Sequence, residues 1–178
     1  MLIPIGSDLY IHDGKELRLL VNGTSQPSII DARLSPDGSY VAYVQDCELY
    51  CVSTATTPGQ PRQLTFDARG QPNKTNGLAE FIAQEEMERS EGYWWSDDSR
   101  FIAFTQVDES NVPAFRISHS GSDNPDQTEE HRYPFAGKPN VKVTVGIVDL
   151  QDTNQSNPSV HWVDLSSFHD SYIARVNF

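Results

Sequence analysis

Short apolar and aromatic stretches, each bounded by turn residues, recur along this chain in a fixed order. Residues 34–44 read Leu-Ser-Pro-Asp-Gly-Ser-Tyr-Val-Ala-Tyr-Val, and residues 95–105 read Trp-Ser-Asp-Asp-Ser-Arg-Phe-Ile-Ala-Phe-Thr. In both stretches an aliphatic or aromatic residue precedes Ser, a tight turn follows, and a strand begins. Pro-Asp-Gly suits such a turn, because Pro presets φ and Gly accepts a positive φ. A second match relates residues 8–11 to residues 48–52.

These matches define a unit of four short strands that occurs twice, with the strands in the same order. The first unit opens with a strand that ends at the Ser-Pro-Asp-Gly turn. The other three strands of the first unit are predicted at residues 40–46, 48–53 and 62–66. The four strands of the second unit are predicted at residues 93–96, 100–107, 140–150 and 160–165. Residues 8–20 supply the last two strands of a preceding unit, and residues 172–178 have the pattern of the first strand of a following one.

The repeat favours one fold class over another. Units of four short antiparallel strands, about 40 residues long when uninterrupted, are typical of β-propeller blades. A β-sandwich also contains many short strands, but it does not require this ordered recurrence. We therefore predict an all-β fold, a partial β-propeller with about two complete blades and two half-blades. Residues 1–178 are expected to be part of a single propeller domain.

Two insertions interrupt the second unit. In the first, at residues 76–92, Leu78, Phe81, Ile82 and Met87 fall near helical spacing between acidic residues. This pattern predicts one short inserted helix near residues 78–91. The second insertion, residues 114–138, is long, polar and rich in turn residues. Insertions of this kind usually carry function or contacts.

The charge balance limits the classes of partner. The chain has 25 acidic and 13 basic residues and a formal net charge of -12. Phosphate binding draws on clustered Lys and Arg, so nucleic acid and anionic membrane surfaces are not expected partners. A protonated amine is compatible with this charge, although solubility alone explains much of it. No stretch of about 18 apolar residues is present, so no segment is expected to span a bilayer.

The sequence contains none of the familiar catalytic or cofactor motifs. It has no Gly-x-Ser-x-Gly nucleophile elbow and no Gly-rich phosphate loop, and its five histidines form no metal-binding pattern. Cys47 and Cys51 lie in one predicted strand, about 13 Å apart at roughly 3.3 Å per residue, which is too far for a disulfide. We therefore expect two free, buried thiols, no cofactor, no metal site and no catalytic residue.

The adjacent acids Glu85 and Glu86 are the one candidate for binding chemistry. Neighbouring side chains on a regular helix diverge by about 100°, but they can converge at a helix end, and Gly92 follows shortly after. Two carboxylates that face a cavity would suit a substrate ammonium, which offers three hydrogen-bond donors. The alternative, favoured by charge pattern alone, is a solvated acidic helix face.

Residues 76–87, Asn-Gly-Leu-Ala-Glu-Phe-Ile-Ala-Gln-Glu-Glu-Met, are followed by Tyr-Trp-Trp-Ser at residues 93–96. This combination resembles the double-glutamate segment of the dipeptidyl peptidase IV family of prolyl oligopeptidase-type serine peptidases. Residues 101–113 and 133–143 also resemble that family, and the resemblance runs over nearly the whole chain.

The resemblance implies that the chain is part of an N-terminal, eight-bladed propeller that caps an α/β-hydrolase domain. That domain, with its Ser-Asp-His triad, is absent here, so the chain alone is not expected to be catalytically competent. Family members release dipeptides from peptide N-termini, usually after Pro or Ala. The resemblance assigns Glu85 and Glu86 to binding of the substrate's N-terminal amine. It also implies a homodimer, with Pro113–Gly137 as a candidate interface.

Two other functions fit the same residues. A non-catalytic member of the family would keep the propeller, lose the nucleophilic serine and act as an interaction protein. A generic propeller scaffold would carry Glu85 and Glu86 on a solvated surface, pointing into bulk water. The sequence leaves the compartment open, since periplasmic, secreted and cytoplasmic locations are all compatible with it.

Overall fold

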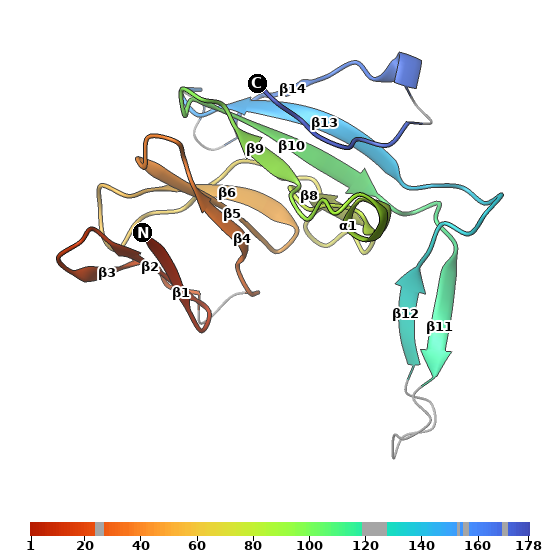
Figure 1. The fold of residues 1–178 in the computed structure, drawn as a ribbon, viewed down its shortest axis with the longest axis horizontal. Coiled ribbons are helices and arrows are strands. Elements are labelled where there is room, and N and C mark those ends of the chain that lie inside the picture. Colours follow the sequence, from red (N-terminus) through yellow and green to blue (C-terminus); the bar gives the residue numbers. More distant parts are fainter. Residues whose placement is uncertain (24–26, 119–127, 153, 155–156, 169–170) are drawn as a thin grey trace.

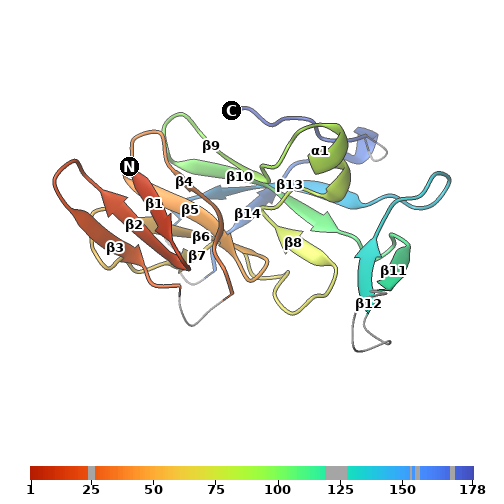
Figure 2. The same cartoon turned by 60° about the horizontal axis from the view of Figure 1, so that its bottom comes forward.

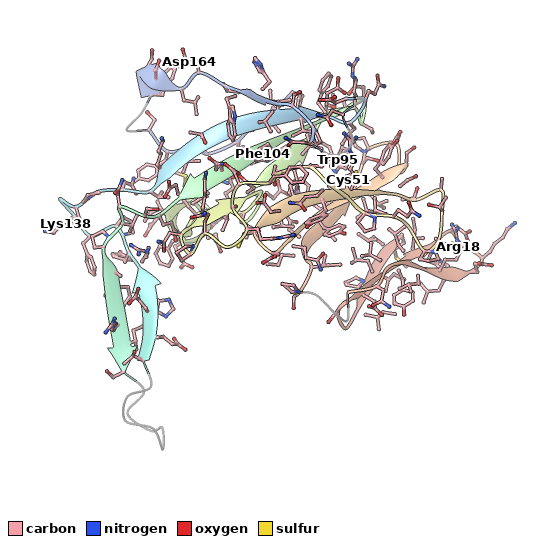
Figure 3. The ribbon with its side chains drawn as sticks, turned by 180° about the vertical axis from the view of Figure 1, so that it is seen from behind. Arg18, Cys51, Trp95, Phe104, Lys138 and Asp164 are labelled. Carbon is pink, nitrogen blue, oxygen red and sulfur yellow. The ribbon has the colours of Figure 1, made fainter. Side chains whose placement is uncertain are left out.

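The computed structural model describes residues 1–23, 27–118, 128–152, 154, 157–168 and 171–178. Their strands form four antiparallel sheets, and three of these stand side by side in chain order (Figures 1 and 2). The structure is nearly all β with one short α-helix, as the sequence predicts. Figure 3 shows Cys51, Trp95 and Phe104 in the middle of the molecule, between Arg18 near one end and Lys138 near the other.

The first sheet has three strands, whereas the sequence predicted two. Its strands pair in the order β1 (Leu2–Ile5), β2 (Asp8–His12) and β3 (Leu17–Val21). The unpredicted strand β1 contains Pro4, which lacks an amide hydrogen for the sheet ladder. Proline is tolerated here because β1 lies at the sheet edge and needs partners on one side only.

The second sheet has the four strands that the repeat predicts. They pair in sequential order and are β4 (Ile30–Leu34), β5 (Tyr40–Gln45), β6 (Glu48–Ser53) and β7 (Arg62–Gln63). Cys47 lies in the turn between β5 and β6 with a φ of 62°, so the prediction that it shares a strand with Cys51 is wrong. Both thiols are free, and only Cys51 is buried.

The third sheet contains the second predicted unit and one additional strand. Its members are β8 (Lys74–Asn76), β9 (Tyr93–Trp95), β10 (Phe101–Asp108), β13 (Lys142–Asp149) and β14 (Val160–Trp162). The extra strand β8 pairs with one end of β10, and β9 pairs with the other end. The inserted helix α1 (Phe81–Glu86) lies between β8 and β9 and is shorter than the predicted segment.

The repeated turn has the same backbone geometry in both units. The Gly38 amide donates a hydrogen bond to the Ser35 carbonyl at 2.9 Å, and the Ser99 amide donates to the Ser96 carbonyl at 2.9 Å. Gly38 has a φ of 74° and Ser99 a φ of 61°. The similarity between residues 34–44 and 95–105 is therefore a similarity of structure as well as of sequence.

Two segments differ from the prediction. The polar second insertion contains a hairpin, β11 (Ala114–Ser118) and β12 (Thr128–Arg132), which extends away from the sheets (Figure 1). Residues 171–178 form no strand, whereas the sequence predicted one at 172–178. A strand needs a hydrogen-bonded neighbour, and none of the described strands pairs with this segment. The 3-10 helix η1 (Ser166–Phe168) precedes it.

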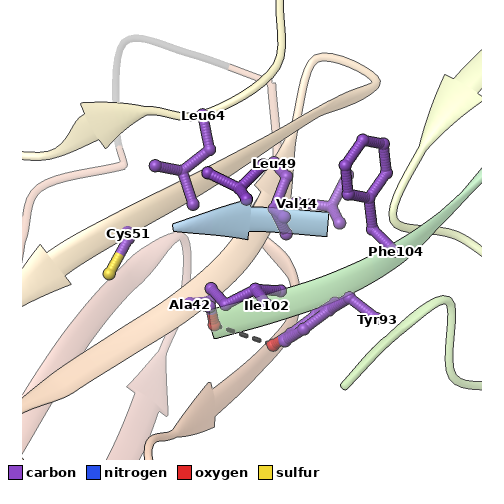
Figure 4. Close-up of a cluster of buried hydrophobic side chains, with 9 residues drawn as sticks. Ala42, Val44, Leu49, Cys51, Leu64, Tyr93, Ile102 and Phe104 are labelled. Carbon is purple, nitrogen blue, oxygen red and sulfur yellow. Dashed lines mark hydrogen bonds between the residues drawn. The ribbon is translucent and has the colours of Figure 1, made fainter. Parts of the chain in front are cut away.

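The second sheet is buried on both faces, because residues of β5 alternate between two neighbouring sheets. Val41 and Tyr43 pack against the first sheet, and Ala42 and Val44 pack against the third. The cluster between the second and third sheets, shown in Figure 4, consists of Ala42, Val44, Leu49, Cys51, Leu64, Tyr93, Ile102, Phe104 and Val148. Face-to-face stacking of consecutive sheets is the packing expected of propeller blades.

Tyr93 connects the second and third sheets by a polar contact inside this cluster. Its side chain is fully buried, and its hydroxyl lies 2.8 Å from the Ala42 carbonyl oxygen (Figure 4). The same hydroxyl lies 2.5 Å from the Asp31 carbonyl oxygen. The Arg33 guanidinium lies 3.9 Å from the Tyr93 ring centroid. Burial raises the pKa of Tyr93 above its usual value, so the hydroxyl keeps its proton and remains a donor.

Replacing Tyr93 by Phe should lower the free energy of unfolding by about 1–3 kcal/mol, because a buried carbonyl loses its donor. Urea denaturation measures this change. Tyr40→Phe is the matched control, since Tyr40 is exposed. Equal stabilities of the two variants would contradict the proposed role of the Tyr93 hydroxyl.

The two thiols should differ in reactivity towards Ellman's reagent. Burial raises the pKa of Cys51 to about 12, so this thiol stays protonated and unreactive in the folded chain. Half-buried Cys47 should react slowly at mildly alkaline pH. The Cys47→Ser variant should therefore show a reactive thiol only after denaturation, and a fast native reaction would show that Cys51 is accessible.

Candidate functional site

The insertion between β8 and β9 is closed at its base by contacts with Thr105 of β10. The Thr105 amide donates a hydrogen bond to the Gly92 carbonyl at 2.8 Å, and the Gly77 amide donates to the Thr105 carbonyl at 2.9 Å. The Thr105 hydroxyl lies 3.1 Å from the carbonyl oxygens of both Leu78 and Gly92. We call this arrangement of Gly77, Leu78, Gly92 and Thr105 the clasp.

The clasp requires glycine at both ends of the insertion. A Cβ on Gly92 would lie 2.3–2.4 Å from backbone atoms of Gly77 and Leu78, which is closer than real contacts allow. Gly77 has a φ of 82°, a conformation that other residues rarely adopt. The two ends of the excursion therefore leave and rejoin the sheet at one fixed point.

Helix α1 is held within the insertion by a buried ion pair. The Glu80 carboxylate lies 2.8 Å from the Arg89 guanidinium, and the two side chains are 1% and 6% exposed. Glu80 stands at the helix N-cap position, where its side chain makes no capping hydrogen bond. The patterns in the sequence do not predict this pair. The available signal was that Arg89 is the one basic residue in the acidic insertion 76–92.

Glu85 and Glu86 lie in the last turn of α1, and both are exposed. Around the helix axis, Ala83 on the buried face is about 160° from Glu85 and about 60° from Glu86, at roughly 100° per residue. Among the described residues, no side chain or backbone group pairs with either carboxylate. A carboxylate that binds a ligand must be accessible, so this exposure is compatible with a ligand site and with a solvated face.

The start of α1 also contacts the base of the hairpin β11–β12. The Phe81 ring lies 5.4 Å from the Tyr133 ring between centroids, and Tyr133 lies 4.9 Å from Phe135. A cavity of about 470 Å³ separates the helix from β8 and the hairpin, and its lining includes Glu80 and Arg132. Glu85 and Glu86 are not among the residues that line this cavity.

The part of the chain that the structure describes offers no group of three or more His, Cys, Asp or Glu side chains that could hold a metal ion. His119 and His169 lie outside the described residues. No helix in the described ranges is long and apolar enough to cross a membrane.

A family model for the dipeptidyl peptidase IV (DPP IV) N-terminal region matches residues 4–178. The chain belongs to the dipeptidyl peptidase IV family. The crystal structure of dipeptidyl peptidase 4 from Porphyromonas gingivalis is similar over 99% of this chain and 25% of that chain, with a TM-score of 0.80 and 25% sequence identity. This similarity assigns the stacked sheets to the propeller region of the family.

Two curated relatives support the assignment. Dipeptidyl aminopeptidase B of Saccharomyces cerevisiae is 32% identical over 130 residues, which are 71% of this chain and 16% of that protein. Human prolyl endopeptidase FAP is 32% identical over 117 residues, which are 65% of this chain and 15% of that protein. The chain therefore spans about a sixth of the length of these relatives.

The clasp predicts that Gly92→Ala will destabilise this dipeptidyl peptidase IV family chain. The added methyl must push two backbone segments apart, which should lower the free energy of unfolding by about 1–3 kcal/mol. Chemical denaturation measures the effect, and Ser90→Ala, an exposed site in the same segment, is the control. A Gly92→Ala variant as stable as the control would contradict the close approach.

Proposed function

We propose that this chain is the substrate-recognition part of the propeller of a dipeptidyl aminopeptidase, a serine peptidase that releases N-terminal Xaa-Pro or Xaa-Ala dipeptides. In this proposal Glu85 and Glu86 bind the protonated N-terminal amine of the peptide. The observation that supports it is a pair of adjacent, exposed carboxylates, without partners in the described part of the chain, at the end of a helix that the clasp ties to the sheet.

The local charge favours a cationic ligand. The C-terminal end of a helix carries a partial negative charge, so acidic side chains there repel it and attract cations. Glu85 and Glu86 stand in the last turn of α1, which has no basic residue. A substrate ammonium offers three donors and supplies the missing positive charge.

The same pair would explain why only free N-termini are substrates. A peptide bound through its interior would leave two carboxylates desolvated without a partner, which is costly. A terminal ammonium supplies the positive charge and the hydrogen-bond donors that both carboxylates need. Binding the amine at a fixed point also sets the distance to the scissile bond, and such positioning is a large part of catalysis.

The rest of the activity requires residues outside this chain. The proposal places the serine nucleophile and its partners in an α/β-hydrolase domain beyond residues 1–178. It further places a homodimer contact on the region Pro113–Gly137, of which the described part forms the hairpin β11–β12. Residues 119–127, between the two strands in sequence, lie outside the described residues.

The proposal predicts that Glu85→Gln and Glu86→Gln will each lower kcat/KM for a free-amine Xaa-Pro p-nitroanilide in the full-length protein. Loss of one charge-assisted hydrogen bond, worth about 1.5–3 kcal/mol, corresponds to roughly a ten- to hundredfold decrease. The matched substrate lacks the amine and should be hydrolysed equally by all variants.

Glu88→Gln is the control, because it removes a nearby exposed acid that the proposal does not use. Unchanged kinetics of Glu85→Gln and Glu86→Gln would support the scaffold interpretation. A full-length protein without a reactive serine would instead support the non-catalytic interaction protein.

A further inference from the structure

The ion pair of Glu80 and Arg89 brackets helix α1. Glu80 directly precedes the helix, and Arg89 follows it after a backbone reversal in which Glu88 has a φ of 53°. One hydrogen bond joins Arg89 Nη2 to Glu80 Oε2 at 2.8 Å. Both side chains are nearly fully buried and point to each other, whereas Glu85 and Glu86 are exposed.

Arg89 contacts three separate parts of the insertion. Its Nη1 donates a hydrogen bond to the Glu91 carbonyl oxygen at 2.6 Å, and its backbone amide donates to the Ala83 carbonyl oxygen at 2.9 Å. The guanidinium lies 5.7 Å from the centroid of the Trp94 ring. The arginine thus joins the residue before the helix, the helix itself and the segment that returns to the sheet.

Stability alone does not account for a buried pair of this kind. Replacing a buried ion pair by apolar residues of similar size is often neutral or stabilising. Here Glu80 Oε1 and Arg89 Nε also lack partners among the described residues, which adds a desolvation cost. What an apolar pair cannot supply is direction, since hydrogen bonds fix the angle between the groups that they join.

A helix of six residues depends on contacts beyond the helix for its orientation. Isolated helices shorter than about 12–15 residues are marginal in water, so tertiary contacts set the orientation of α1. The clasp fixes where the insertion leaves and rejoins the sheet, but its glycines stand apart from the helix. Gly77 lies four residues before Phe81, and Gly92 lies six residues after Glu86. The ion pair acts closer to the helix, on both of its ends.

We propose that Glu80 and Arg89 are positioning residues that fix the orientation of the last turn of α1, and so direct the carboxylates of Glu85 and Glu86 toward one ammonium. This inference rests on the proposed function. Loss of the pair lets the last turn change its orientation relative to the sheet, so the two carboxylates no longer face the ammonium together and the amine is bound by one of them at a time.

The test uses the full-length protein with Glu80→Leu/Arg89→Met, which removes both charges together and leaves no unpaired buried ion. Thermal unfolding and labelling by a fluorophosphonate probe, which reacts with the serine nucleophile, should stay close to wild type. The preference for a free-amine substrate over its des-amino analogue should fall about tenfold or more, mainly through KM.

Two further variants make the result decisive. Arg100→Met breaks an exposed Arg100–Asp149 ion pair on the same sheet and should leave the amine preference unchanged. Arg89→Lys keeps the positive charge but loses the guanidinium geometry that donates to Glu80 and to the Glu91 carbonyl at once. It should therefore lower the preference for the free-amine substrate by an intermediate factor. If the double variant does not fold, Arg89→Lys decides in its place.

The outcomes separate the two proposals. If Glu85→Gln and Glu86→Gln reduce the amine preference but Glu80→Leu/Arg89→Met keeps the wild-type value, the positioning role is overturned and the proposed function stands. If the glutamine variants have no effect, the proposed function fails and the positioning role fails with it. A loss of amine preference in Glu85→Gln, Glu86→Gln and the double variant supports both the proposed function and the positioning role.

Discussion

The clasp at Gly77, Leu78, Gly92 and Thr105 is the constraint on which the candidate site depends. The chain leaves the third sheet at Gly77 and rejoins it at Gly92, with 14 residues between them, and Thr105 of β10 hydrogen-bonds both ends. The missing Cβ of Gly92 allows the two backbone segments to touch. Because β10 is itself buried against the second sheet, through Ile102 and Phe104, the excursion is anchored to the core of the molecule.

Two further contacts, the Tyr93 hydrogen bonds and the Glu80–Arg89 ion pair, position the insertion beyond that anchor. Tyr93 fixes the third sheet to the second, so β9 starts from a defined position. The buried pair of Glu80 and Arg89 then orients a helix that is too short to be stable alone. The result is an acidic helix end on a rigid support, in a family whose curated relatives include a dipeptidyl aminopeptidase.

Local chemistry decided how much of this could be predicted from the sequence. The turns after Leu34 and Trp95 have typical turn residues, and the strands that follow them are apolar and aromatic. The predicted strands of both units therefore lie close to their observed bounds. Strand β8 carries only Lys-Thr-Asn and exists because β10 offers it a partner, so no pattern marks it. The hairpin β11–β12 has little buried surface and hence no alternation to detect.

The glutamate pair was visible in the sequence, whereas the ion pair that supports it was not, since Glu80 and Arg89 meet only across a chain reversal. The most direct test of amine binding by this pair is a crystal structure of the full-length protein with a bound Xaa-Pro dipeptide. The dipeptide ammonium should lie about 3 Å from carboxylate oxygens of both Glu85 and Glu86. An ammonium bound elsewhere, with both carboxylates in solvent, would contradict it.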